Sequence, residues 1–442
     1  MLDSTFDKLK NINRFSELRL PMLFFGLAVW IVVPIIGNIP ILLSIQLSLL
    51  QRKHLKTSLL SIDNILLSLV VLSLSIYVSS FDVFADTRIY LDIYDTLDVK
   101  GIFDNLFFQD RYEFVLFLLL YPIHILTNGS EYLCLFLFSL IMNLAIVFYV
   151  GKKLSPKYYP TLLIIVFSTY FYYSQVFYMR QFLSITLVMM AFVSLESSWL
   201  MFIIWSLLAI FSHLTAAIYV GICLAAKFAF YIRENIKIKF TKKDKIFLYI
   251  AIAFVAAVLL YIGWIIYNNP QEIYSYTNRA LDLLPEKRLS SSIQDRVTEY
   301  DGRDTDLFQL SIFRAIAIMA ISIFVFIRSQ KNLTPKLLSL IAIFILSILQ
   351  IVFIIVTGFN QRIVYLFLSF YGFFFWIGLN EKTKIKPLGL VSLITIFVAA
   401  ANTFSLSVIQ ANMIDADGWS FFNGQPLTMS IYDYIVYFFQ SI

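Results

Sequence analysis

The chain has 442 residues, of which 60% are hydrophobic and 14% are charged, and its formal net charge is +6. Soluble domains carry roughly 25% charged residues, so this composition excludes an ordinary water-soluble protein. The positive charge does not indicate a nucleic-acid partner, because Lys and Arg form short clusters between apolar stretches and no basic face with interleaved aromatic residues stands apart from them.

The apolar residues form successive runs, many of them close to the roughly 20 residues with which an α-helix crosses a bilayer. The runs lie at residues 22–50, 59–81, 112–127, 131–150, 160–178, 181–195, 199–212, 214–231, 246–268, 309–328, 337–358, 363–380 and 387–409. They predict an all-α, polytopic membrane bundle of about 12–13 transmembrane helices, with residues 1–442 as a single transmembrane domain. The first run contains Pro34, Gly37 and Pro40, so it is compatible with one crossing or with a hairpin.

Clusters of basic residues indicate the side of each loop, because Lys and Arg are enriched in cytoplasmic loops. These clusters lie at residues 52–56, 152–157, 233–245, 328–336 and 382–386. All of them fall on the cytoplasmic side only if the short, proline-containing run 112–127 does not cross. The sequence therefore predicts a surface helix over 112–127 at the outer side. The outer, periplasmic side then receives a first loop over 82–130, a second over 269–308 and a tail over 410–442.

The first outer loop begins with acidic, basic and aromatic residues in the segment Asp86-Thr-Arg88-Ile-Tyr90. A carboxylate at the outer end of a span can serve as a general base, and arginine can bind phosphate oxygens. The alternative is a solvated loop whose tyrosines lie in the interfacial belt. Glu113, at the start of the surface helix, is a second candidate carboxylate, although an acidic residue there also suits the helix dipole.

Arg180 and Gln181 stand between two apolar runs without a polar linker. An arginine at membrane depth usually has a partner or faces a wet cavity, and the alternative is a side chain that reaches the lipid headgroups. His213 lies at a later junction of the same kind, where imidazole can exchange a proton near neutral pH or form a structural hydrogen bond.

A further outer turn contains Asn360 and Arg362, with Tyr365 one helical turn beyond. The planar fork of arginine suits phosphate oxygens. No metal site is expected, since Cys134 and Cys223 both lie inside apolar runs and no zinc spacing is present. On this topology, arginines that suit a pyrophosphate and proton-transfer groups that suit a sugar hydroxyl converge on one bilayer face.

The order of these motifs resembles the EpsG-like group of Wzy-type polysaccharide polymerases, from about residue 80 to about residue 380. The similarity is carried by Asp86 with Tyr90, then Glu113, then Met-Arg-Gln at Arg180, then Phe-Ser-His at His213, then Asn-x-Arg at Arg362. The predicted surface helix also resembles the architecture of GT-C membrane glycosyltransferases.

The resemblance implies an enzyme that transfers a growing glycan from undecaprenyl pyrophosphate to a lipid-linked repeat unit and so builds O-antigen or capsule. It implies a bacterial inner-membrane protein with a periplasmic active site, without cofactor or metal, and with a chain-length regulator protein as a possible partner besides membrane lipids. Asp86 or His213 would be the base. The other implied site residues are Glu113 for catalysis, Arg180, Arg362 and Arg88 for pyrophosphate, and Tyr90, Gln181, Asn360 and Tyr365 for the glycan.

Other functional classes remain as alternatives to a polymerase. A lipid-linked oligosaccharide flippase would be a transporter, a class that tends to have paired repeats and polar groups near the bilayer midplane. An O-antigen ligase would be a related glycosyltransferase that acts on the same lipid donors.

Overall fold

The computed structural model describes residues 2–51, 61–80, 85–95, 97, 114–154, 156, 158–167, 178–236, 334–343 and 430–440. Over these ranges the structure is all-helical and contains no β-strand, as the sequence predicts. The chain divides into two compact units, one of Met1–Cys223, Val325–Asn332 and Gly372–Ile442, the other of Leu224–Phe324 and Leu333–Tyr371. The features discussed below lie in the first unit.

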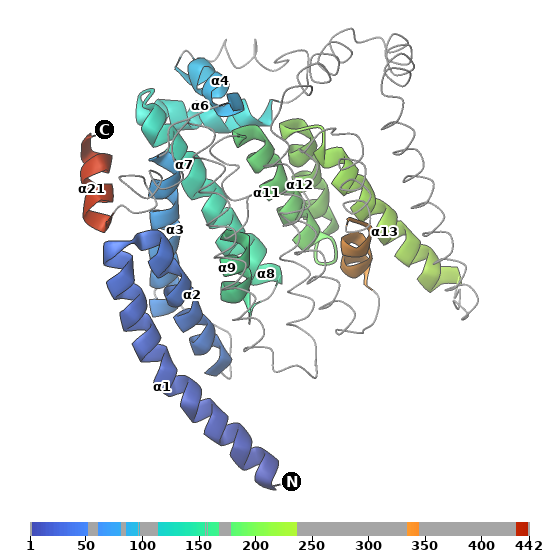
Figure 1. Cartoon of the computed structure of the whole chain (residues 1–442). Helices are drawn as coiled ribbons and strands as arrows, with labels where there is room; N and C mark the ends of the chain where they lie inside the picture. Colours follow the sequence, from blue (N-terminus) through green and yellow to red (C-terminus); the bar gives the residue numbers. More distant parts are fainter. Residues whose placement is uncertain are drawn as a thin grey trace, which may run out of the picture. The chain divides into compact units, whose positions relative to one another are not determined.

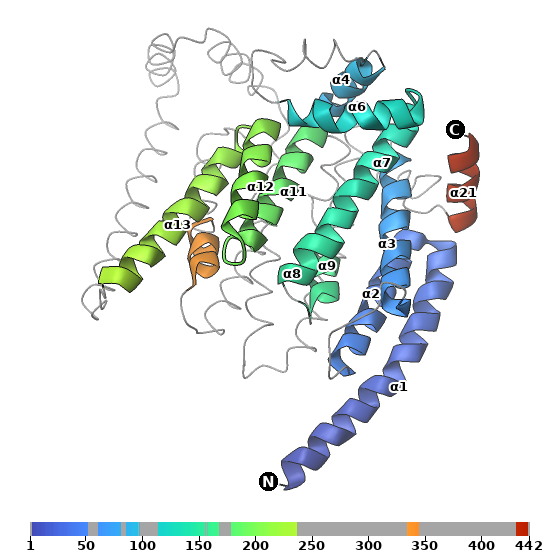
Figure 2. The same ribbon diagram turned by 180° about the vertical axis from the view of Figure 1, so that it is seen from behind.

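The helices of the first unit follow one another along the chain as Figures 1 and 2 show. They are α1 (Leu2–Val32), α2 (Pro34–Gln51), α3 (Ile62–Ser79), α4 (Ala85–Tyr94), α6 (Val115–Thr127), α7 (Glu131–Leu144), the π-helix η2 (Ala145–Gly151), α8 (Lys152–Leu154), α9 (Tyr159–Phe167), α11 (Met179–Ser194), α12 (Trp199–Ser212), the first part of α13 (Ala216–Ile236) and α21 (Ile431–Gln440). The second unit is described over the rest of α13 and a short helix at residues 335–343.

Two helical stretches among the described residues are long and apolar enough to cross a membrane, Ile62–Ser79 and Glu131–Leu154. Shorter apolar helices surround them, and large apolar side chains on several helices point away from the protein. Phe24 on α1 is 67% exposed and Leu200 on α12 is 66% exposed. Contiguous exposed apolar surface of this kind is typical of a lipid-facing protein.

The first apolar run forms a pair of helices, α1 and α2, because the chain breaks at Val33. Pro34 disfavours a helical conformation at the preceding residue, yet it fits the first turn of α2, where a backbone N–H would have no partner. The helices approach closely at Gly37, where a Cβ atom would lie 2.4 Å from Cα of Trp30. Only glycine allows this contact, so the run is a tight helical hairpin.

α3 runs antiparallel to the continuous stretch of α7, η2 and α8. The Lys152 ammonium donates to Oδ1 of Asn64 over 3.0 Å at one end, and Nδ2 of Asn143 donates to Oγ of Ser75 over 3.2 Å further along. Residue numbers therefore rise along α3 as they fall along its partner. The chain passes from α3 to α7 through α4 and α6, which lie at one end of the bundle.

α6 runs crosswise to α7, α11 and α12 in both views of the bundle (Figures 1 and 2). It ends at Asn128, which adopts a left-handed conformation with φ of 50°, and Gly129 follows with φ of 83°. Its exposed side is apolar and includes Ile125 and Leu126, which are 62% and 77% exposed. An apolar helix at this place and angle fits the boundary between headgroups and acyl chains.

Candidate active site

α11 and α12 form an antiparallel hairpin that brings Arg180 and His213 to the same end of the bundle. Arg180 lies in the first turn of α11, and His213 follows the last residue of α12. Oγ of Ser184 donates to the carbonyl of Ala209 over 3.0 Å and ties the helices together one turn below this end. Both candidate residues are buried, with 5% and 8% exposure.

α4 packs against this end through a stripe of buried residues with helical spacing: Thr87, Tyr90, Leu91 and Tyr94. Oγ1 of Thr87 accepts a hydrogen bond of 3.2 Å from the backbone N–H of Met179. This bond satisfies one of the N–H groups that the first turn of α11 leaves without a helical partner. Thr87 is a positioning residue that the sequence analysis missed, although the periodic stripe was visible in the sequence.

Tyr90 brings an aromatic ring beneath the buried guanidinium of Arg180. Cζ of Arg180 lies 5.4 Å from the centre of the Tyr90 ring, within the range of a cation–π interaction. The Tyr90 ring itself is held edge-to-face by Phe117 of α6, with 6.3 Å between ring centres. The structure thus joins two of the predicted site residues, and it fixes the plane of the guanidinium from below.

The ring of His213 has a defined hydrogen-bonding side. Its Nδ1 atom lies 3.3 Å from the backbone nitrogen of Thr215 and 2.7 Å from the hydroxyl of the same residue. A backbone N–H can only donate, so Nδ1 accepts, and the proton of the neutral ring resides on Nε2. His213 therefore presents an N–H donor at Nε2.

α6 closes over the same end of the bundle. The ring of Phe114, which precedes α6, lies 5.2 Å from the ring of Phe211 near the end of α12. Glu113 is the neighbour of Phe114 in the chain but falls outside the described residues. The packing of Phe114 brings this part of the chain to within two residues of His213 in sequence.

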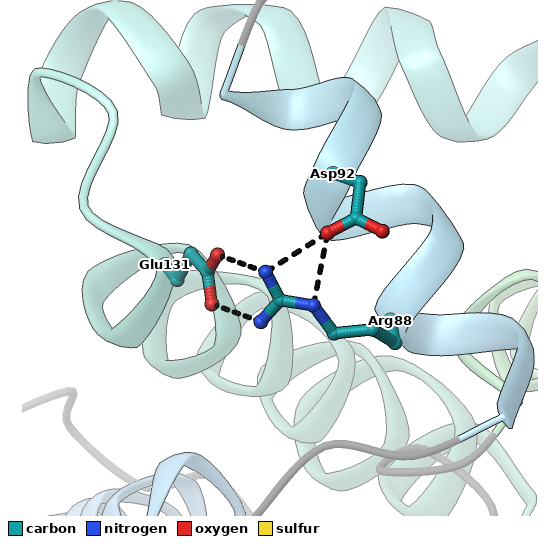
Figure 3. A network of polar contacts seen from close by, with 3 residues as sticks. All are labelled: Arg88, Asp92 and Glu131. Carbon is teal, nitrogen blue, oxygen red and sulfur yellow. Dashed lines mark hydrogen bonds and ion pairs between the residues drawn. The ribbon is translucent and has the colours of Figure 1, made fainter.

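Arg88 lies on the exposed side of α4 and forms a network with carboxylates (Figure 3). Its terminal nitrogens donate to both carboxylate oxygens of Glu131, each over 2.9 Å. Nε and Nη2 also lie 2.9 and 2.8 Å from Oδ1 of Asp92. The hydrogen bonds from Glu131, and then from Asp92, hold the pKa of the Arg88 guanidinium above its ordinary value. Glu131 was not among the predicted site residues, because its partner is far away in sequence.

The remaining predicted site residues are placed only in part. The backbone of Asp86 lies in the first turn of α4, one helical turn before Tyr90. Gln181 is buried beside Arg180 at 4% exposure. The residues that fall outside the described ranges, so that their roles stay predictions, are Glu113, Asn360, Arg362 and Tyr365. Within the described residues, no group of three or more His, Cys, Asp and Glu side chains could hold a metal ion.

Comparison with known proteins gives one family. The model of the EpsG family matches residues 64–414, a range that begins in α3 and includes every predicted site residue. No curated protein and no solved structure matches the chain. The matched family and the exposed apolar helices together indicate a membrane protein that takes part in polysaccharide synthesis.

Proposed function

The chain belongs to the EpsG family, and from this premise we propose that it is a membrane glycosyltransferase that polymerises undecaprenyl-pyrophosphate-linked oligosaccharides. The observation that carries the proposal is the guanidinium of Arg180, buried and oriented by Tyr90 at the end of the bundle where His213 and α4 meet. A buried arginine beside a proton-transfer group suits the release of a lipid pyrophosphate. The product is O-antigen or capsular polysaccharide.

The reaction is the transfer of the growing glycan from its lipid carrier to a new repeat unit. The acceptor hydroxyl attacks the anomeric carbon of the donor, a glycosidic bond forms, and the bond from that carbon to the pyrophosphate oxygen breaks. The leaving pyrophosphate gains negative charge, which Arg180 and Arg362 stabilise in a partly dehydrated site. The donor already carries the energy for the step, so the reaction needs no nucleotide.

The proton of the acceptor hydroxyl goes to Asp86. The alternative base is His213, but its Nδ1 already accepts from Thr215, and its Nε2 carries a hydrogen in the neutral ring. We assign His213 as a donor to a pyrophosphate or glycan oxygen through Nε2–H. A positioned base of this kind contributes about 10²–10⁴-fold to the rate.

The site belongs on the outer side of the inner membrane under this proposal. Lys152 and Lys153 lie at the opposite end of the bundle from α4 and α6, since the α7–α8 stretch runs its whole length between them. Basic residues favour the cytoplasmic side. The chemistry then takes place where lipid-linked repeat units arrive after translocation.

The test is an in vitro assay of the purified protein with undecaprenyl-pyrophosphate repeat units, resolved by length on a gel. The wild-type protein should produce a ladder without added nucleotide or metal. Arg180→Ala and Arg362→Ala should abolish the ladder at normal protein levels, whereas Lys153→Gln, at the other end of the bundle, should leave it unchanged.

Other results would point to the competing classes. Translocation of the lipid in proteoliposomes without a ladder would identify a flippase. Transfer of a finished glycan to a different lipid acceptor, again without a ladder, would identify a ligase.

A further inference from the structure

We propose that Arg88, Glu131 and Asp92 form a latch that fixes α4 on the bundle and thereby sets the position of Tyr90 and Asp86 relative to Arg180. Arg88 then acts as a positioning residue rather than as a ligand of the pyrophosphate. The inference rests on the proposed function only for its effect on catalysis, because its structural part concerns the placement of α4 itself. We call the three residues the α4 latch.

The contacts of Arg88 are those of a structural fork. Both terminal nitrogens pair with both oxygens of Glu131, which is the bidentate arrangement that fixes the relative orientation of two groups. The contact to Asp92, one turn along the same helix, holds the guanidinium from the other side (Figure 3). The carboxylates thus engage every nitrogen of the Arg88 guanidinium.

Glu131 is a well-placed anchor for this fork. It is the first residue of α7, where a negative charge suits the helix dipole. Oγ of Ser130 caps the same helix by accepting from the N–H of Leu133. The preceding turn has left-handed backbone at Asn128 and Gly129, which fixes the direction in which α7 starts. Position 131 is therefore held by the bundle and not by Arg88.

α4 depends on such an anchor because it is only 10 residues long. An isolated helix shorter than about 12–15 residues is marginal in water. Different elements hold it: Thr87 binds the start of α11, and the Tyr94 hydroxyl contacts the Thr127 hydroxyl at the end of α6. The latch adds the attachment to α7.

The latch controls the rotation of α4, since it pulls on the side opposite to the catalytic residues. Positions 88 and 92 lie on the exposed flank, whereas Thr87 and Tyr90 lie on the buried face. By helical period, Asp86 lies on the same side of α4 as Tyr90. A rotation of α4 would therefore move the base and the ring beneath Arg180 together.

The test is a charge swap in the ladder assay, with initial rates measured over a range of donor concentration. Because Asp92 would repel a glutamate at position 88, all variants are made in an Asp92→Asn background, which should lose no more than about threefold in activity. Arg88→Glu and Glu131→Arg should each lower kcat about 10- to 100-fold, the scale expected for a small displacement of reacting groups. KM for the lipid donor should change little, since Arg180 lies on α11.

The double variant separates a latch from a ligand. Arg88→Glu combined with Glu131→Arg should restore kcat to within about threefold of the background, because the pair is re-formed with its charges exchanged. A double variant as inactive as Arg88→Glu would overturn the inference and assign Arg88 to the pyrophosphate. Glu196→Arg, a charge change in the exposed turn between α11 and α12, is the control and should have no effect.

An activity-independent measurement keeps this test distinct from that of the proposed function. Spin labels at Ile89→Cys on α4 and Leu126→Cys on α6, both exposed, report the placement of α4 in a Cys134→Ala, Cys223→Ala background. The distance distribution should be narrow, broaden in each single variant and narrow again in the swap. An unchanged distribution in the single variants would overturn the latch, whereas a wild-type protein that forms no ladder would contradict only the polymerase.

Discussion

The contact between Arg180 and Tyr90 makes the proposed role of the arginine measurable. Replacing Tyr90 by leucine removes the aromatic face 5.4 Å from the guanidinium while keeping an apolar side chain in a position that is 3% exposed. A desolvated cation–π interaction contributes about 2 kcal/mol. If that energy holds the guanidinium in the orientation that the transition state needs, its loss corresponds to a decrease in kcat/KM of about 30-fold.

Companion variants separate the ring from the hydroxyl and from general packing. Tyr90→Phe keeps the aromatic face and should stay within about threefold of wild type, since phenylalanine also supports a cation–π contact. Phe117→Leu removes the edge-to-face partner of Tyr90 but leaves the ring beneath Arg180, so it should cost less, on the order of 0.5–1.5 kcal/mol. In an Arg180→Met background, Tyr90→Leu should lower the residual rate by no more than about twofold, because the interaction is already absent.

The assay is single transfer to a radiolabelled acceptor, which measures low rates without requiring long polymers. Full activity of Tyr90→Leu would refute the reasoning, because the orientation of Arg180 would then not matter for the chemical step. Equal losses in Tyr90→Leu and Tyr90→Phe would instead assign the effect to the hydroxyl, as expected of a residue that contacts the glycan.

Further variants test the histidine, the helical hairpin and the sidedness. His213→Gln, whose amide can donate near the Nε2 position, should keep at least about tenfold more activity than His213→Asn, and equal loss in both would favour a base. Gly37→Ala should destabilise the detergent-solubilised protein by about 1–3 kcal/mol in thermal unfolding, because its Cβ meets Trp30. Gly221→Ala, with open space around the new atom, should not destabilise it and is the control. Asp95→Cys should react with an impermeant maleimide in spheroplasts and Lys153→Cys only after permeabilisation; the reverse would place the site in the cytoplasm.

Local sequence patterns predicted the helical fold and the family. Runs of apolar residues require helices in a bilayer, since every backbone polar group must be satisfied within the segment. The order of short motifs around Arg180 and His213 indicated the family that the comparison then confirmed. The number of crossings and the periplasmic face stay predictions.

Contacts between distant segments could not be predicted in the same way. The pairing of Arg88 with Glu131 joins residues 43 positions apart, and no periodicity encodes it. Met179 and Thr87 are 92 positions apart, and their bond depends on how α4 packs. The first run was ambiguous because a proline can kink a helix or end it, and only the close packing at Gly37 decides for a hairpin.

The complete enclosure of α11 has a consequence for the biogenesis of the protein. All 16 residues of this helix are buried, among them Arg180, Gln181 and Ser184. A helix of that length spans about 24 Å, less than the roughly 30 Å of the hydrocarbon core, and an arginine lowers its tendency to enter lipid alone. We therefore expect the translocation machinery to release α11 together with the apolar α12 as one hairpin. Substitutions that make α12 more polar would then reduce the amount of inserted protein without touching the chemistry at Arg180.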